Sequence, residues 1–567
     1  MTAEERIRAA LAGALASMGV EDAAVQLERP RDPAHGDLAS NVALSLASRL
    51  RRPPRQIADE IARTLDLEEA GVASVEVAGP GFMNFRLALG AIAEGLREIL
   101  TLDEAFGRSA TGGGERVMVE WVSANPTGPL HLGHGRQAAL GDAIAALLEW
   151  TGWNVHREFY YNDSGQQMEL LARSVWARYQ EALGEPTEIP EGGYHGEYVA
   201  DVARSFVDEV GDLYRDDESA AALEAMRRFA GRVLMEEIQR DLDEFRVRFD
   251  EHYRESSLYE EGKVDRTVAA LRGTGLVYDR EGAVWLRTTE FGDQKDRVML
   301  RGSGAPTYFL PDVAYHVTKW ERGFRATINV QGADHHGTVA RVRAGLRALG
   351  LPEGYPEYVL HQMVTVERGG EEVKLSKRAG SYTTLRELFE EVGVDVARWF
   401  FQMRRPEAHL VFDLDVALDP SEKNPVYKVQ YAHARMHSIF AKAGVDAAGV
   451  SAEGVDLARL EHPSERELVK RLADFPETLE RAAASRAPHV LCDYLEQTAG
   501  QVNSWYHAGN PSRNPELAVL VPDAELRGAR LALARAVQIV LRNGLRVLGI
   551  HAPQRMERVV EEQPPEA

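Results

Sequence analysis

The apolar positions at the start of the chain follow two different periods. Segment 7–15 has the helical period, and Asp37 precedes a second helical pattern that it is placed to cap. Segment 72–87 alternates apolar and polar residues around a Gly-Pro-Gly turn, which predicts two paired strands. We therefore expect a small α/β domain over residues 1–112, which ends in a glycine-rich joint.

The middle of the chain predicts a parallel sheet. A strand pattern at 117–122 leads through a turn into an Ala/Leu-rich helix, and a second strand pattern follows at 155–160. This βαβ order implies that ligands bind at the carboxyl ends of the strands. Charged helical patterns over 166–260 are too long for a simple crossover, so we expect an insertion there. The sheet is expected to resume near 283–286 and again at 326–330.

Strand patterns largely vanish after residue 419, where helices such as 426–440 and 527–542 dominate. The fold class that follows is multidomain, with a small N-terminal α/β domain, a Rossmann-like parallel-sheet domain and an all-α C-terminal domain. The acidic, proline-containing end of the chain is expected to be disordered. The expected boundaries are 113–415 for the sheet domain, about 166–282 for its helical insertion, 416–556 for the helical domain and 557–567 for the tail.

Composition narrows the class of protein. Of the residues, 44% are hydrophobic and 27% are charged, as in globular proteins. We expect a cytoplasmic protein, because the sequence contains neither a membrane-spanning apolar run nor a signal-peptide pattern. The single cysteine, Cys492, excludes an internal disulfide and a zinc site built from paired cysteines. A net charge of −22 argues against a protein that coats nucleic acid through bulk charge, although local basic patches such as residues 341–347 can hold a folded RNA.

Two histidines lie at the expected start of the first helix of the sheet domain. His131 and His134 are three positions apart, so both rings can face one side, next to the free N–H groups of a helix N-terminus. Pro126 and Gly128 shape the turn before them, and Gly133 removes a side chain where a flat base could approach the backbone. The arrangement suits a triphosphate, whereas an isolated pair with this spacing is more often two surface histidines.

A lysine-rich segment far downstream favours the triphosphate site over two surface histidines. Lys374, Ser376 and Lys377 lie in the run KLSKR, and loop lysines can neutralise the β- and γ-phosphates of ATP as pyrophosphate departs. By itself such a run is usually solvated charge. The sequence contains no GxxxxGK[ST] motif, so the phosphate site must be built differently from a P-loop.

A second set of residues is suited to a guanidinium group. This group is planar, permanently charged and rich in donors, so its pocket needs carboxylates in a fixed array and a flat neighbour. Glu120 ends the strand before the histidine turn. Asp312 follows Tyr308 by four residues, which puts ring and carboxylate on one face if the segment is helical. The alternative interpretation of these two residues is a core aromatic side chain and a helix cap.

The motifs resemble those of class I aminoacyl-tRNA synthetases in kind and in order. HLGH is similar to the HIGH signature, KLSKR is similar to the KMSKS loop, and GADHH at 332–336 resembles the third nucleotide element of the class. The resemblance implies that the catalytic residues His131, His134, Lys374 and Lys377 stabilise the phosphates in the transition state. Asp334 is expected to bind the ATP ribose. The other residues expected to contact ATP are Pro126, Gly128, Gly133, Gly332, His335 and Ser376.

Resemblance along essentially the whole chain narrows the family to the arginyl-tRNA synthetases. It is carried by the segments EWVSANPTGPLHLGH, YYNDSGQQ, TYFLPDVAYH, QGADHH and NPVYKVQYAHAR. It implies that Asn125 holds the α-amino group of the substrate, while Glu120, Tyr308 and Asp312 grip its guanidinium. The other residues expected in this pocket are Ser123, Asn162, Asp163, Gly165 and Gln166.

The resemblance implies the ligation of L-arginine to tRNA(Arg) through an arginyl-adenylate, with ATP as a substrate and Mg²⁺ bridging its phosphates. The N-terminal domain is expected to contact the tRNA elbow and the C-terminal helices the anticodon. A monomer without a protein metal site is expected. Two alternatives stay open: a class I synthetase for another amino acid, such as lysine or cysteine, or a catalytically silent tRNA-binding paralogue. The first would keep the signatures and lose the pocket, and the second would lose the histidines or the loop lysines.

Overall fold

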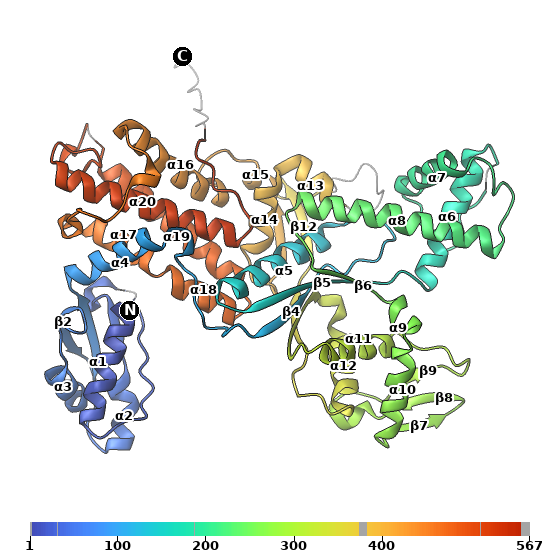
Figure 1. Cartoon of the computed structure of the whole chain (residues 1–567), viewed down its shortest axis with the longest axis horizontal. Coiled ribbons are helices and arrows are strands. Elements are labelled where there is room, and N and C mark those ends of the chain that lie inside the picture. The colour runs from blue at the N-terminus through green and yellow to red at the C-terminus, as the bar shows by residue number, and fades with distance from the viewer. Residues whose placement is uncertain (1–2, 31, 186, 374–382, 511, 557–567) are drawn as a thin grey trace, which may run out of the picture.

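The computed structural model describes residues 3–30, 32–185, 187–373, 383–510 and 512–556. The N-terminal domain lies below the helical domain in Figure 1, and α4 connects the two. The three strands of the N-terminal domain form an antiparallel sheet in the order β1-β3-β2. Helices cover this sheet, and their apolar faces form a separate core with it. The elements are α1 (Ala3–Ser17), β1 (Leu38–Ser40), α2 (Val42–Leu50), α3 (Pro54–Thr64), β2 (Val72–Ala78), β3 (Phe82–Leu87) and α4 (Leu89–Leu102).

The prediction that Asp37 caps a helix is wrong. The residue before α2 is Asn41, whose side chain makes no capping bond. One oxygen of Asp37 accepts a hydrogen bond from the backbone N–H of Leu87 at 2.7 Å, and the other pairs with Lys470 of the helical domain. Asp37 therefore joins the β2–β3 hairpin to a neighbouring domain, a contact that no local pattern could indicate.

A parallel sheet occupies the centre of the chain, with the order β11-β10-β4-β5-β6 among the described residues. The first strand in sequence, β4, lies in the middle, because β5 and β6 add on one side and β10 and β11 on the other. Ligands of such sheets bind outside the carboxyl ends of the strands, where the order reverses. The elements are β4 (Arg116–Glu120), α5 (Leu132–Trp150), β5 (Asn154–Tyr161), β6 (Glu251–Arg254), α11 (Phe309–Glu321), β10 (Ala326–Gly332), α12 (His336–Ala348) and β11 (Glu357–His361).

Helix α5 follows the turn after β4 and is buried along most of its length, because its Ala/Leu-rich sequence is apolar on nearly all sides. Because Gly141 has no side chain, α5 can approach the sheet closely. A Cβ atom there would lie 2.2 Å from Cγ of Trp121, well inside van der Waals contact. Close packing of α5 on the end of β4 thus fixes the turn between them.

The insertion after β5 is helical, as predicted, but shorter than expected. Helices α6 (Gln166–Ala182), α7 (Glu197–Val210) and α8 (Ala220–Glu244) share a separate apolar core and project to the right in Figure 1. The chain then returns to the central sheet as β6, inside the range expected to be helical. Because β6 is a four-residue edge strand with the sequence EHYR, it shows no apolar run.

The prediction that the central sheet resumes at 283–286 is wrong. Strand β8 (Ala283–Leu286) pairs instead with β7 (Val277–Arg280) and β9 (Arg297–Leu300) in a separate antiparallel sheet. Helices α9 (Ser256–Glu260) and α10 (Lys263–Gly273) connect β6 to it. This subdomain lies beside α11 and shares an apolar core with it.

Helices make up most of the remaining chain. After β11 come β12 (Val364–Arg368), β13 (Glu371–Glu372), α13 (Leu385–Val392), α14 (Val394–Gln402), β14 (Leu410–Asp413) and α15 (Leu414–Ala417). The C-terminal domain contains α16 (Pro425–Ala443), α17 (Pro463–Ala473), α18 (Phe475–Ala484), α19 (Pro488–Ala508) and α20 (Ala524–Val547). None of the helices in the described ranges has the length and apolarity needed to cross a membrane.

Candidate active site

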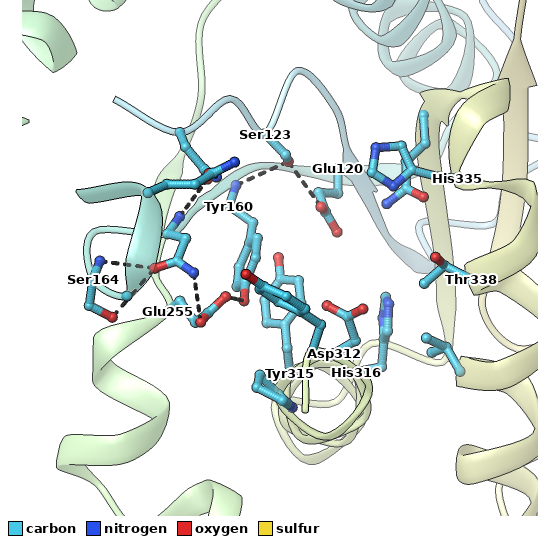
Figure 2. A pocket seen from close by; sticks show the side chains of 18 of the residues that line it. Glu120, Ser123, Tyr160, Ser164, Glu255, Asp312, Tyr315, His316, His335 and Thr338 are labelled. Atoms are coloured by element: carbon cyan, nitrogen blue, oxygen red, sulfur yellow. Dashed lines mark hydrogen bonds between the residues drawn. The ribbon is translucent and has the colours of Figure 1, made fainter. Parts of the chain in front are cut away.

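A cavity of about 800 Å³ opens at the carboxyl ends of β4, β5 and β10. This is the edge at which the strand order reverses, so the sheet topology alone selects it. Figure 2 shows α11 below the cavity and the strand ends above it. Carboxylates face the cavity from three elements: Glu120 at the end of β4, Glu255 just before α9, and Asp312 on α11. Such a lining favours a cationic ligand.

The turn after β4 has an unusual backbone. Val122 has a φ of 65° and Ser123 a φ of 44°, and residues other than glycine rarely adopt this backbone region. The hydroxyl of Ser123 donates to Glu120 Oε1 at 2.9 Å and accepts from the backbone N–H of Tyr160 at 3.2 Å. Strain of this kind persists where the surrounding structure holds it in place. The turn therefore fixes the direction of the Glu120 carboxylate.

A chain of hydrogen bonds builds the wall between β4 and β6. Asn125 Oδ1 accepts from the backbone N–H of Asn162 at 2.9 Å, and its Nδ2 donates to Gln167 Oε1 at 2.8 Å. Asn162 Nδ2 then donates to Glu255 Oε1 at 2.9 Å, and the Tyr160 hydroxyl donates to Glu255 Oε2 at 2.7 Å. Burial raises the pKa of Glu255. Both oxygens of this carboxylate are therefore held in one orientation at the cavity wall.

The opposite wall is α11 and the residue before it. Tyr308 lines the cavity with 70% of its surface exposed, and Asp312 lies one turn further along. The Asp312 carboxylate has no hydrogen bond or ion pair with any residue that the structure describes. The pKa of Asp312 is raised to about 7. Burial is the largest cause, and the negative charges of Glu255 and Glu120 are the next largest. A half-buried carboxylate without a protein partner is suited to a bound cation.

His131 and His134 form a reciprocal cap at the start of α5. The His134 backbone N–H donates to His131 Nδ1 at 3.3 Å, and the His131 N–H donates to His134 Nδ1 at 3.4 Å. Their rings stack with centroids 3.7 Å apart, and burial lowers the pKa of both. A Cβ atom at Gly133 would lie 2.9 Å from the His131 ring, so the stacked ring itself requires glycine here. Two neutral imidazoles thus cover a helix N-terminus.

Strand β10 is the neighbour of β4 in the central sheet, so the segment after β10 lies beside the N-terminus of α5. Gly332 ends the strand, and Asp334 and His335 follow in a short 3₁₀ turn. The Asp334 side chain is 75% exposed, and its Oδ2 lies 3.6 Å from His335 Nε2. An exposed carboxylate in this position can accept hydrogen bonds from two hydroxyl groups of a ligand.

Most residues predicted for the amino-acid pocket line the cavity, but Asp163 does not. Its carboxylate accepts from the backbone N–H and the hydroxyl of Ser256, at 3.0 and 2.7 Å, and so braces the start of α9. The predicted pocket residues that line the cavity are Glu120, Ser123, Asn125, Asn162, Gly165, Gln166, Tyr308 and Asp312.

Only some of the residues predicted to bind ATP line the cavity. His134 and His335 line the cavity, whereas Pro126, Gly128, His131, Gly133, Gly332 and Asp334 do not. Lys374, Ser376 and Lys377 lie outside the described residues. The chain that follows them is attached beside the histidines: Thr384 pairs with His131 in an isolated β-bridge, and the Leu385 N–H donates to the Leu130 carbonyl at 2.8 Å.

Several residues of the site were missed from the sequence. Glu255 follows a charged edge strand and carried no signal. Tyr160 and Tyr315 stack with centroids 4.2 Å apart beneath the cavity, and the spacing of Tyr315 from Asp312 on one helix could have indicated it. Lys319, two turns after Asp312, is fully buried and pairs with Glu120.

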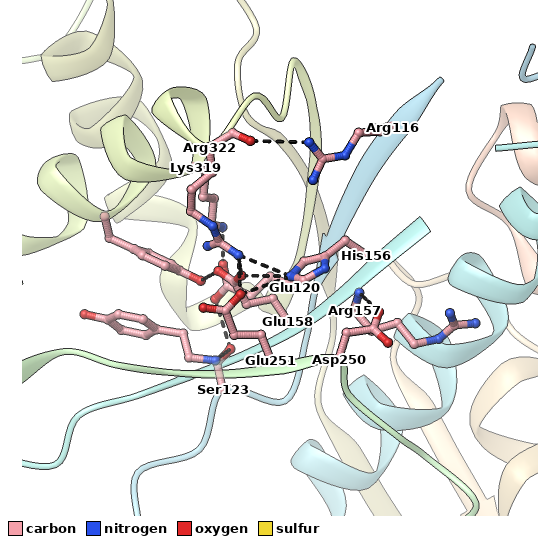
Figure 3. A network of polar contacts seen from close by, with 12 residues as sticks. Arg116, Glu120, Ser123, His156, Arg157, Glu158, Asp250, Glu251, Lys319 and Arg322 are labelled. Carbon is pink, nitrogen blue, oxygen red and sulfur yellow. Dashed lines mark hydrogen bonds and ion pairs between the residues drawn. The ribbon is translucent and has the colours of Figure 1, made fainter. Parts of the chain in front are cut away.

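One cluster behind the site has the ligand types of a metal centre. His156, Glu158 and Glu251 bring one nitrogen and two carboxylates together. Arg322 already bridges the two carboxylates, with Nη2 at 2.6 Å from Glu158 and 2.5 Å from Glu251 (Figure 3). Burial opposes ionisation of Glu158, but hydrogen bonds from His156 and Arg322 outweigh it and bring its pKa to about 2. We interpret the cluster as an ion-pair network.

Three family models match consecutive parts of the chain. They describe the arginyl tRNA synthetase N terminal domain over residues 2–87, the catalytic domain of tRNA synthetases class I (R) over 96–402, and the DALR anticodon binding domain over 429–556. The catalytic model alone covers more than half of the chain and contains every described residue of the cavity.

Similar proteins agree with these models. An arginine–tRNA ligase of Thiobacillus denitrificans is 49% identical, over 94% of this chain and 95% of its own. One from Geotalea daltonii is 50% identical, over 94% of both chains. The solved structure of arginyl-tRNA synthetase from Thermus thermophilus superposes with a TM-score of 0.73 at 27% identity, over 97% of this chain and 99% of its own.

Proposed function

Because the chain belongs to the arginyl-tRNA synthetase family and is an ATP-dependent arginine–tRNA ligase, we propose that the cavity between β4 and α11 is its arginine site. The observation that carries this proposal is the carboxylate of Asp312, which faces Glu120 and Glu255 across the cavity and pairs with none of the residues that the structure describes. A guanidinium supplies planar, permanently charged donors to such an array. A synthetase for lysine or cysteine and a silent paralogue are both disfavoured, because the relatives that cover about 94% of this chain are arginine–tRNA ligases.

Each group in the pocket has a role that follows from its surroundings. Glu120 and Asp312 bind the guanidinium from opposite walls, and Tyr308 offers its ring as the flat neighbour. Asn125 binds the α-amino group of arginine, with Asn162 and Gln167 holding its amide in place. Glu255 is fixed by two hydrogen bonds and supplies a third negative charge.

ATP is proposed to bind over the start of α5. His131 and His134 contact its phosphates together with the helix N-terminus, and Asp334 accepts hydrogen bonds from the ribose hydroxyls. Lys374 and Lys377 bind the β- and γ-phosphates. Mg²⁺ bound to ATP would supply positive charge to the triphosphate beside these residues. Among the described residues, the cluster of His156, Glu158 and Glu251 is already paired with Arg322, so we do not assign that ion to it.

The reaction needs no protein nucleophile. The arginine carboxylate attacks the α-phosphate of ATP, which releases pyrophosphate and forms arginyl-adenylate. A ribose hydroxyl at the end of the tRNA then attacks the adenylate carbonyl, which releases AMP. The protein contributes position and charge, through the pocket carboxylates on one side and the histidines and lysines on the other.

Finer properties of the molecule belong to the same proposal. We propose that the protein works as a monomer in the cytoplasm. The domain boundaries are placed at residues 112, 415 and 556, and the helical insertion consists of α6, α7 and α8. The N-terminal domain contacts the tRNA elbow, and the C-terminal helices contact the anticodon.

Aminoacylation with the Asp312→Ala variant tests the arginine site. We expect the arginine KM to rise at least about 30-fold while the ATP KM changes less than twofold, because one of the two guanidinium partners is lost. Asp293→Ala is the matched control, since Asp293 pairs with Arg297 in the β7–β9 subdomain. An unchanged arginine KM in Asp312→Ala would show that arginine binds elsewhere.

A further inference from the structure

One row of side chains crosses the central sheet behind the arginine site. The strand register aligns Asn329 of β10 with Glu120 of β4, Glu120 with Glu158 of β5, and Glu158 with Glu251 of β6. Because aligned residues of neighbouring strands face the same side, three carboxylates lie next to each other. Like charges directly opposite on a sheet repel, so such a row needs cations in fixed places.

The end of α11 supplies those cations, as Figure 3 shows. Lys319 pairs with Glu120 and donates to Asn329 Oδ1 at 3.1 Å, while Arg322 pairs with Glu158 and Glu251. Lys319 is fully buried and its ammonium lies 4.4 Å from the centre of the Tyr315 ring. It does not line the cavity. Its contacts therefore all lie within the protein.

Lys319 joins the two walls of the pocket. Asp312 lies seven residues earlier on the same helix, and at that spacing both side chains point to the same face. The ion pair with Glu120 thus ties the face that carries Asp312 to the end of β4. Lys319 and Ser123 each hold one oxygen of the Glu120 carboxylate. Each oxygen keeps one further acceptor position for a ligand.

We propose that Lys319 is a positioning residue for arginine recognition: it holds the carboxylates of Glu120 and Asp312 at the separation that a guanidinium requires, and it reduces the repulsion between them. The proposal rests on the arginine site assigned above. Arginine never contacts Lys319, so the lysine acts on the substrate through Glu120 and α11.

Other charged and titratable groups face this pair from each packed element. Glu158 of β5 and Glu255 beside α9 add negative charge, and Arg341 of α12 lowers the pKa of Asp312 together with Lys319. Tyr160, Tyr315 and Tyr358 have a raised pKa, and that of His316 is lowered, mainly by burial, so these four stay neutral near pH 7. Loss of Lys319 removes one of the two positive charges that lower the pKa of Asp312 and leaves Arg341 as the other.

The first test replaces Lys319 by Met, which keeps the length of the side chain, and by Gln, which keeps a donor without the charge. In aminoacylation at pH 7.5 we expect the arginine KM to rise about tenfold or more in both variants, with the ATP KM within twofold of wild type. We also expect the arginine kcat/KM to reach its plateau at a higher pH, because the pKa of Asp312 rises further. Unchanged arginine KM values, or equal losses for arginine and ATP without a pH shift, would overturn the proposal.

A double variant keeps the proposal testable if the single variants fold poorly. Glu120→Gln alone leaves the buried ammonium of Lys319 without its ion-pair partner beside a cationic substrate. Adding Lys319→Met removes that charge, so the arginine KM of the double variant should be lower than that of Glu120→Gln. A double variant that is no better, or worse, would show that Lys319 does not act through Glu120.

Two controls separate this inference from the assignment of the site. Arg530→Met breaks the buried Arg530–Glu465 pair of the helical domain and should lower Tm while the arginine KM changes less than twofold. Asp312→Ala reports on the site itself. An effect of Asp312→Ala without any effect of the Lys319 variants would reject the role of Lys319 alone, whereas no effect of either would reject the arginine site.

Discussion

At the scale of single residues, Asp312 is poised to make arginine use depend on pH. Its pKa of about 7 means that a proton must leave before the carboxylate can bind a guanidinium. We therefore expect the arginine kcat/KM, which reports on the free enzyme, to fall about tenfold per pH unit below about pH 7. The measurement is aminoacylation between about pH 5.5 and 8.5 at saturating ATP and tRNA. A profile that stays flat down to about pH 5.5 would contradict the assignment of Asp312.

The Asp312 carboxylate should also destabilise the protein when no arginine is bound. Between the ordinary pKa of 3.8 and about 7, the folded protein keeps a proton that the unfolded chain has released, so stability falls as pH rises through that window. Asp312→Asn removes this cost and should raise Tm at pH 8 by roughly 2–5 °C, and the gain should vanish near pH 4. Asp293→Asn is the opposite control: the Arg297 hydrogen bonds lower the pKa of Asp293, so its loss should lower Tm at pH 8. Equal shifts in both variants would refute this account.

At the scale of elements, the packing of α5 on β4 decides whether the turn between them can form. A Cβ at Gly141 would meet the Trp121 ring, so Gly141→Ala should destabilise the protein by about 1–3 kcal/mol and raise the KM values for both arginine and ATP. Gly90→Ala in α4 is the matched control, because a Cβ there meets nothing within 4 Å. The control should be neutral or slightly more stable. Denaturant unfolding and aminoacylation of the two variants measure both effects.

Elements with a strong periodic pattern were predictable from the sequence, and short or charged ones were not. The strand at 155–160 appeared where expected, because its apolar residues face a core. The spacing of Tyr308 and Asp312 left open whether their segment is helical, and α11 shows that it is helical from Phe309 onward. Strand β6 failed because an edge strand of four residues needs little burial. The ion pair between Lys319 and Glu120 joins residues 199 positions apart, and its partners follow from strand register, which a single sequence does not contain.

At the scale of the whole molecule, the domain types follow from composition and pattern, but the contacts between domains do not. Asp37 was expected to cap a helix, and it pairs instead with Lys470 across a domain boundary. Arg29 pairs with Asp474 at the same junction, where burial raises the pKa of that aspartate to about 7. These contacts seat the N-terminal domain on α17 and the start of α18.

That junction should matter for tRNA and not for the small substrates. Lys470→Ala and Arg29→Ala each remove one ion pair between the domains, so the combined variant should raise the KM for tRNA about three- to tenfold. The arginine and ATP KM values at saturating tRNA should change less than twofold, because the cavity lies in the central domain. Arg459→Ala serves as the control, since Arg459 pairs with Asp523 within the helical domain. If the combined variant and the control gave the same tRNA KM, the junction would not orient the N-terminal domain for tRNA.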